Sequence, residues 1–156
     1  EDGSGWYPIH YAIMRLKGES PATAIEMVQF LLDCNPSLAS QKFSGKFPLA
    51  VVCVLAGEVA SSTVRSVAMK ILHLLFDAHP EAIDDNLIEA SFDRLPEEMQ
   101  NFINVQRTYA RLARDSTLMS TRDENGRLPL HRALQDSATL GSIKLLVKGN
   151  PLAIRT

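Results

Sequence analysis

The sequence has few cysteines, few aromatic residues and no long apolar run. Only 2 cysteines occur in 156 residues, and both lie among apolar neighbours, in the segments Leu31–Cys34 and Val51–Leu55. These surroundings predict reduced, buried thiols of an intracellular protein, and they argue against a disulfide framework. The longest apolar run, Phe47–Ala56, is far shorter than the roughly 20 residues that cross a bilayer, so we expect no membrane insertion.

Neither sign of charge dominates the chain. Its 16 basic and 18 acidic side chains leave a formal net charge of −2, which does not favour nucleic acid or an acidic membrane surface as a partner. The composition, 46% hydrophobic and 22% charged, is that of a globular protein, and we expect it in the cytoplasm, with the nucleus as an alternative. The opening Glu1-Asp2-Gly3, without Met, predicts a longer parent chain.

A glycine followed three residues later by a proline recurs along the chain. It occurs in Gly5–Ala12, Gly45–Val52 and Gly126–Ala133, and the prolines stand 40 and 81 residues apart. Proline suits the first position of a helix, where its missing N–H would be unpaired anyway, and the glycine suits the turn before it. The pattern therefore predicts a hairpin turn that leads into a short helix.

A second landmark follows each of these, an apolar helix that ends at a proline. It occurs in Phe30–Pro36, Leu74–Pro80 and Leu145–Pro151. Two landmarks in a fixed order predict four repeat units, which we place at residues 2–41, 42–84, 85–122 and 123–156. The third is degenerate, and for it we expect a short helix over Asn86–Arg94 and a long one from Pro96 to about Arg114, with Ser116-Thr117 at the stop.

The expected second helices carry one apolar stripe each. Its members are Ile25, Val28, Leu31 and Leu32 in the first unit and Met69, Leu72, Leu75 and Phe76 in the second. The segment Thr23–Glu26 offers a capping box at the start of the first of these helices.

The run D-x-x-G-x-x-P-[IL]-H-x-A, at Asp2–Ala12 and Asp123–Ala133, resembles the ankyrin-repeat signature. The sequence departs from it where Tyr7, Phe47 and Leu128 replace threonine and Ala50 replaces histidine. The repeats are also longer, and we place the extra residues in inter-helix loops around 15–21 and 57–66. The resemblance implies an all-α, ankyrin-like α-solenoid of stacked helix-turn-helix repeats with short hairpin loops, forming a single domain over 1–156 with further repeats in the parent chain.

The resemblance also implies roles for individual residues. The structural repeat signature comprises Asp2, Gly5, Pro8, His10, Gly45, Pro48, Asp123, Gly126, Pro129 and His131. The two histidines would fix the turn into the first helix, with backbone groups as their partners. Partner-binding positions on hairpin tips and first helices would be Trp6, Met14, Arg15, Phe43, Lys46, Glu124, Asn125, Arg127 and Gln135, with Gly3, Ser4, Val54 and Leu55 beside them. For Trp6 the alternative is packing on its own repeat.

The function that follows is a protein-protein interaction module, an intracellular scaffold whose protein partner the sequence does not identify. The alternative is a structural repeat spacer without a dedicated partner site. We expect no enzyme, cofactor, metal or small-molecule substrate, since the chain has no glycine-rich phosphate loop, paired-carboxylate motif or Cys/His cluster at metal spacing. Arg107, Arg111 and Arg114 form a basic stripe, either a solvated face or a docking site for an acidic partner or a phosphate.

Overall fold

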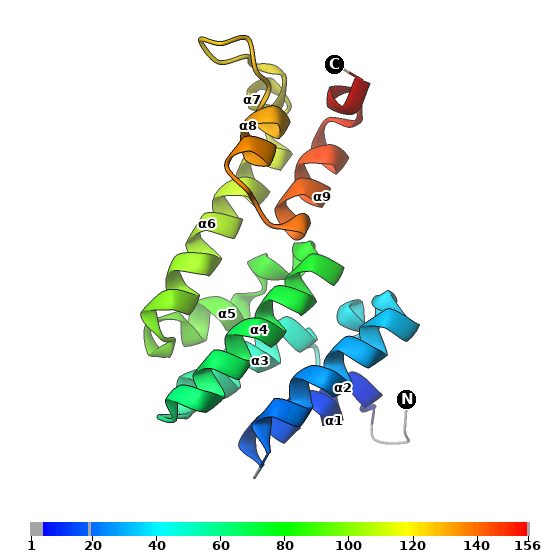
Figure 1. The fold of residues 1–156 in the computed structure, drawn as a ribbon, viewed down its shortest axis with the longest axis vertical. Coiled ribbons are helices and arrows are strands. Elements are labelled where there is room, and N and C mark those ends of the chain that lie inside the picture. Colours follow the sequence, from blue (N-terminus) through cyan, green and yellow to red (C-terminus); the bar gives the residue numbers. More distant parts are fainter. Residues whose placement is uncertain (1–4, 19, 156) are drawn as a thin grey trace. The chain divides into compact units, whose positions relative to one another are not determined.

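The structure is a computed structural model that describes residues 5–18 and 20–155. These ranges hold nine α-helices, five 3-10 helices and no β-strand, which confirms the predicted all-α class (Figure 1). Asp2, Gly3 and Ser4 of the expected signature and hairpin lie outside the described residues. Within the same ranges, no helix has both the length and the apolar character needed to cross a membrane.

The helices recur in a fixed order of first helix, second helix and a single short turn of helix. The first set is α1 (Pro8–Met14) with η1 (Arg15–Lys17), α2 (Pro21–Cys34) and η2 (Pro36–Ser40). The second set is α3 (Pro48–Glu58), α4 (Ser62–Ala78) and η3 (Pro80–Asp84). The third is α5 (Asn86–Ser91) with η4 (Phe92–Arg94), α6 (Glu97–Arg114) and α7 (Ser116–Ser120). The fourth is α8 (Pro129–Gln135), α9 (Leu140–Gly149) and η5 (Pro151–Arg155).

Glycine and proline set the starts of three first helices as the sequence predicts. The glycines adopt the left-handed φ values that side chains disfavour, 82° at Gly5, 79° at Gly45 and 74° at Gly126. α1, α3 and α8 each begin at the proline three residues later. The turn therefore fixes where the chain enters each helix.

The third helix pair confirms the expectation for the degenerate stretch. α5 and η4 together cover Asn86–Arg94, and α6 ends at Arg114. Asp115 then caps the following turn, since its carboxylate accepts the N–H groups of Thr117 and Leu118 at 2.9 and 3.0 Å. In the first pair Asn35 has the same role, accepting the Ser37 N–H at 3.1 Å. Asp115 thus takes the capping role in the third pair that Asn35 has in the first, without a proline after it.

Three expectations of local structure are wrong. Cys34 is exposed, because it lies at the last position of α2 outside the buried stripe, whereas Cys53 is buried as predicted. Thr23 forms no capping box, since α2 begins at Pro21 and the Thr23 hydroxyl donates to the Ser20 carbonyl at 2.7 Å. The extra residues around 57–66 lengthen helices rather than a loop, because only residues 59–61 separate α3 from α4.

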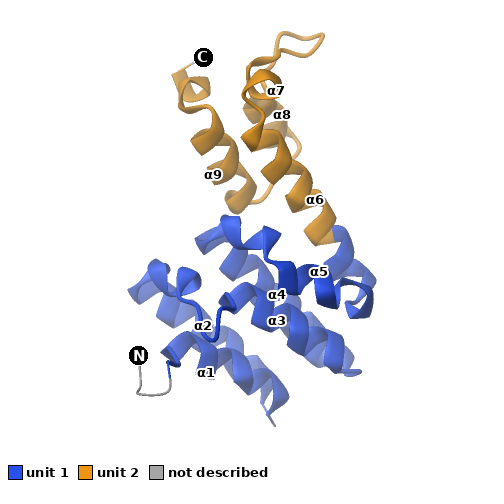
Figure 2. Cartoon of the chain, turned by 180° about the vertical axis from the view of Figure 1, so that it is seen from behind, with its two compact units in different colours: residues 1–101 blue, residues 102–156 orange. Residues whose placement is uncertain are grey.

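The chain divides into two compact units, residues 1–101 and 102–156, with the division inside α6 (Figure 2). In the first unit α2 packs against α1 and α4, and α3 packs against α4 and α5. The predicted stripes supply part of this core, with Val28, Leu32, Leu72, Leu75 and Phe76 buried and Ile25, Leu31 and Met69 partly buried. The second unit buries its own core between α7, α8, α9 and η5, made of Met119, Leu128, Leu130, Ala133, Leu146 and Ala153.

Candidate interaction surfaces

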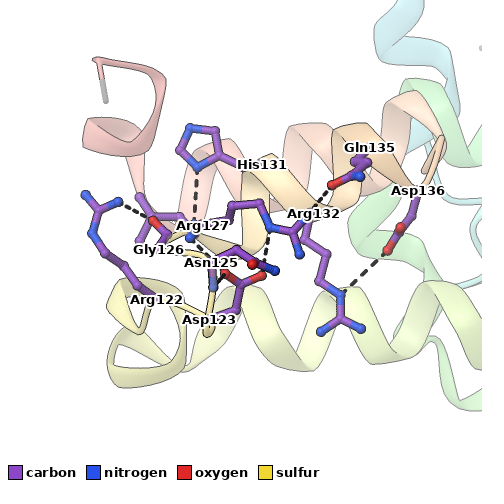
Figure 3. Close-up of polar contacts among 10 residues, drawn as sticks. Arg122, Asp123, Asn125, Gly126, Arg127, His131, Arg132, Gln135 and Asp136 are labelled. Carbon is purple, nitrogen blue, oxygen red and sulfur yellow. Dashed lines mark hydrogen bonds and ion pairs between the residues drawn. The ribbon is translucent and has the colours of Figure 1, made fainter.

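The hairpin before α8 is organised by the carboxylate of Asp123. This carboxylate accepts the backbone N–H groups of Asn125 and Arg127 and the Arg127 guanidinium, each at 2.9 Å (Figure 3). The Asp123 carbonyl accepts the Gly126 N–H at 2.8 Å, which closes the turn. The backbone N–H of Arg127, followed by the other donors, lowers the pKa of Asp123 below its ordinary value. Asp123 of the predicted signature is therefore an ionised organiser of the turn.

Polar contacts continue from this hairpin onto α8. The Arg127 guanidinium also donates to the side-chain oxygen of Gln135, and Arg122 donates to the Gly126 carbonyl at 2.7 Å (Figure 3). Arg132 lies 3.7 Å from Asp136 one turn further along. The structure thus brings together Asn125, Arg127 and Gln135 of the predicted binding set.

These side chains line an open polar cavity of about 570 Å³ in the second compact unit. Its lining is Arg122, Asp123, Glu124, Asn125, Arg127, Arg132, Gln135 and Asp136. Arg127 and Arg132 contact the lining carboxylates Asp123 and Asp136, and Arg122 donates to the carbonyl of the neighbouring Gly126. The charges of this surface are therefore balanced locally.

The corresponding hairpin side of the first helix pair is aromatic. The ring centroids of Trp6 and Phe43 lie 4.0 Å apart, and Tyr11 of α1 lies 5.2 Å from Trp6. Phe43 belongs to the next hairpin, where it forms an antiparallel bridge with Lys46. Stacked rings of this kind give a rigid surface with a large contact area. The sequence identified Trp6 and Phe43 but not Tyr11, whose place on the outer side of α1 could have indicated it.

His10 lies fully buried beneath these rings, with centroid distances of 5.9 Å to Trp6 and 5.8 Å to Phe43. Its Nδ1 accepts the Tyr7 N–H at 3.3 Å, and His131 accepts the Leu128 N–H at 3.2 Å in the same way. The expected backbone partners of both histidines are confirmed. Burial lowers the pKa of His10, so the ring is neutral at pH 7, and an Nδ1 that accepts leaves the proton on Nε2.

An open apolar groove of about 630 Å³ lies beside the aromatic rings, between α1 and α2. Trp6, Tyr11 and Arg15 line one side, and Met27 and Phe30 line the other. Tyr11, Met27 and Phe30 are 53%, 42% and 66% exposed, which is unusual for three large neighbouring side chains. Sequence periodicity missed Met27 and Phe30, because it identified one stripe on α2 and they belong to a second.

The remaining predicted positions differ in exposure. Met14 and Arg15 are exposed on the first helix pair, and Lys46 is exposed at the hairpin tip. Leu55, in contrast, is only 5% exposed, since α3 packs against its neighbours on several sides. The expectation that Leu55 belongs to a free binding face is therefore wrong.

The basic stripe predicted in the third unit lies on α6. Arg111 and Arg114 of the basic stripe are exposed on α6, and Arg107 is partly buried. Between residues 5 and 155, leaving out residue 19, no three His, Cys, Asp or Glu side chains gather closely enough to hold a metal ion.

Comparison of the chain with known protein families, with curated proteins and with solved structures found no match.

Proposed function

We propose that this chain is an ankyrin-like helical-repeat module that binds a protein partner and performs no reaction of its own. The ankyrin-like arrangement is supported by the recurring order of first helix, second helix and short turn, and by three hairpins with a left-handed glycine. In such an architecture the hairpin tips and the outer sides of the first helices carry no stacking duty, so they can vary to suit a partner.

The observation that carries the proposal is the aromatic surface at the first two hairpins. The partly exposed rings of Trp6 and Phe43 stack at 4.0 Å, and Met14 at the end of α1 and Lys46 on the hairpin of Phe43 are exposed. Aromatic residues dominate binding energy at protein interfaces, because they bury much area with little loss of conformational freedom. A partner surface with an apolar centre and an acidic rim suits the rings together with Arg15 and Lys46.

The polar side chains in these regions support a binding role over a catalytic one. The Nδ1 of His10 holds the turn into α1, and the carboxylate of Asp123 holds the hairpin before α8. We propose no catalytic, cofactor-binding or metal-binding role for any residue of the chain. The partner that we propose is a protein rather than nucleic acid or a small molecule.

The test is capture of a partner from cell extract by the purified chain, with each bound protein quantified by mass spectrometry. The double variant Trp6→Ala with Phe43→Ala should reduce the captured amount of a specific partner about tenfold or more, while the helical circular dichroism stays unchanged. Trp6→Arg provides a second variant, because Arg127 occupies the equivalent position before α8 and is compatible with the same backbone.

The matched control is Val105→Ala, which removes a 50% exposed apolar side chain from α6 in the other compact unit. It should leave capture unchanged. A chain that retains the same proteins with and without Trp6 and Phe43 would be a structural spacer, and unfolding of the double variant would assign both rings to the core.

A further inference from the structure

The second compact unit also contains an apolar pocket of about 410 Å³ between α6, α7 and α8. All residues that line it lie between 108 and 136, so the pocket belongs to this unit alone. Its volume falls within the range of pockets that hold a ligand. The apolar wall is formed by Tyr109 and Leu112 of α6, Leu118 of α7, and Pro129 and Ala133 of α8. Elements of the described chain thus surround the pocket on each side.

Leu118 is exposed at a position where the other helix pairs cover an apolar side chain. It lies three residues after Asp115, the residue that precedes α7, and it is 50% exposed. Counted in the same way from the residue before each short turn of helix, the corresponding residues are Leu38, Ala82 and Ala153. Leu38 is partly buried, and Ala82 and Ala153 are 0% and 3% exposed. A large apolar side chain on the wall of the pocket is therefore accessible to a partner.

Three arginines line the same pocket, two from the ends of the hairpin and one from α8. They are Arg122, Arg127 and Arg132, and the carboxylates of Asp123 and Asp136 line the pocket with them (Figure 3). Arg127 contacts Asp123 at 2.9 Å, whereas Arg132 lies 3.7 Å from Asp136 and both of these side chains are mostly exposed. Because an exposed pair at this distance contributes little, Arg132 can turn to another carboxylate at small cost.

Arg122 has a neutral group as its partner. Its guanidinium donates to the Gly126 carbonyl at 2.7 Å, and the residue is exposed. Glu124, which lines the neighbouring polar cavity, does not line the apolar pocket. The three arginines of the apolar pocket therefore face two carboxylates, and the rim carries a positive charge that a partner can neutralise.

An apolar wall beside a surplus guanidinium fits an apolar side chain that has a carboxylate close to it. A guanidinium binds a carboxylate well, because two parallel N–H groups match its two oxygens. A nucleic-acid backbone fits less well, since Asp123 and Asp136 would repel its phosphates. We propose that this pocket binds an acidic protein segment, in which one large apolar side chain packs on Leu112 and Leu118 and a neighbouring carboxylate pairs with Arg122.

The test is a titration of short fluorescent peptides with the purified chain, followed by fluorescence anisotropy at about 0.15 M salt, where distant charges are largely screened. In three peptides a phenylalanine, leucine or methionine is flanked by glutamates on both sides, and at least one of them should bind saturably. Replacing its apolar residue by serine, or its glutamates by lysines, should weaken binding at least about tenfold, because either change removes one of the two complementary contacts.

Two variants of the chain test the two contacts separately. Leu118→Ser and Arg122→Glu should each weaken binding of the glutamate peptide at least about tenfold. Arg122→Glu should also bind the lysine-flanked peptide more tightly than the unmodified chain does. Both residues are exposed, so the circular dichroism of each variant should match that of the unmodified chain.

The matched controls make the same changes outside the pocket. Leu140→Ser removes a 56% exposed leucine of α9, and Arg111→Glu reverses an exposed charge of the basic stripe on α6. Neither residue lines the pocket, so both controls should bind the glutamate peptide like the unmodified chain.

Three results would overturn the proposal. They are no saturable binding of any of the three peptides up to about 1 mM, normal binding by Leu118→Ser or Arg122→Glu, and an equal loss of binding in Arg111→Glu. The variant with Trp6→Ala and Phe43→Ala should bind the peptide normally, because both rings belong to the other compact unit, and a loss there would contradict the proposal as well. Partner capture through Trp6 and Phe43 is measured separately, so this proposal and the proposed function can fail independently.

Discussion

The first and fourth helix pairs have the same key residues in their turns, but one has an apolar surface and the other a polar one. Both begin with a left-handed glycine, a proline at the first helical position and a histidine that accepts a backbone N–H. Where the first pair has Trp6 and Tyr11, the fourth has Arg127 and Arg132. The first surface is consequently an open apolar groove, whereas the fourth is bridged by hydrogen bonds and ion pairs.

The difference shows that few positions specify the backbone of these helix pairs. Glycine, proline and histidine act on their own hairpin, through φ values and hydrogen bonds that span only a few residues. Side chains at the variable positions can then be aromatic or charged without changing the turn. Substitutions at the shared and the variable positions should therefore have effects of different size.

The largest effect should come from Gly149, because the backbone of α9 lies close to the Ala113 carbonyl of α6 there. Gly149→Ala would place a Cβ 2.3 Å from the Ala113 carbonyl, and relieving this overlap should cost about 1–3 kcal/mol of unfolding free energy. Urea unfolding followed by circular dichroism measures it. The matched substitution is Cys34→Ala at the exposed last position of α2, as Gly149 is the last position of α9, and it should change stability by less than about 0.5 kcal/mol. Equal effects at the two positions would contradict the close packing of α9 on α6.

The second effect concerns the shared turn. Gly45→Ala and Gly126→Ala should each cost about 1 kcal/mol, because a Cβ disfavours the left-handed φ values of 79° and 74°. Among the described residues other than the glycine and its two chain neighbours, no heavy atom lies within 4 Å of either added Cβ, so the cost is that of the backbone alone. Thermal unfolding of both variants should therefore show similar losses. A loss at only one of the two would mean that the hairpins are not equivalent.

These local features explain how much of the fold the sequence could predict. Neighbouring residues set the helix starts at Pro8, Pro48 and Pro129 and the span of α6. These features could therefore be predicted from the sequence. The exposure of Cys34 and Phe30 depends on which helices pack against α2, and the sequence pattern does not contain that information.

The candidate surfaces were predictable to the same extent. Asn125, Arg127 and Gln135 lie together because hairpin and helix are adjacent in sequence. The groove joins α1 to α2, and so its Met27 and Phe30 could not be assigned from the hairpin signature.

The third effect is a dependence of stability on pH that comes from the side chain of His10. Burial lowers the pKa of His10 below its ordinary value of 6.5, so the unfolded chain takes up this proton first as pH falls. The contribution of His10 to stability is therefore full above pH 6.5 and decreases as pH falls from there towards the lowered pKa.

His10→Asn keeps an acceptor for the Tyr7 N–H but removes the titration. Its unfolding free energy should decline less than that of the unmodified chain between about pH 7 and pH 5. Burial lowers the pKa of His73 too, so His73→Asn should flatten the same curve and the double variant should flatten it further. An unchanged slope in His10→Asn would show that the ring is not desolvated.

The smallest effect should come from the pair Arg132 and Asp136, which contact each other at 3.7 Å and are 69% and 54% exposed. Exposed pairs of this kind contribute little, because water screens them and ordering two side chains has an entropic cost. A double-mutant cycle with alanine should give a coupling of at most about 0.5 kcal/mol.

The equivalent residues of the first helix pair allow a stronger version of the same experiment. Replacing Arg132 by tyrosine and Asp136 by arginine would give α8 and its C-cap the residues that α1 and its C-cap have, Tyr11 and Arg15, and we expect the fold to retain its stability. A coupling above about 1 kcal/mol, or unfolding of the exchanged variant, would mean that this ion pair helps to hold α8. The variable positions would then have a structural role, and the aromatic surface of the first pair could no longer be attributed to binding alone.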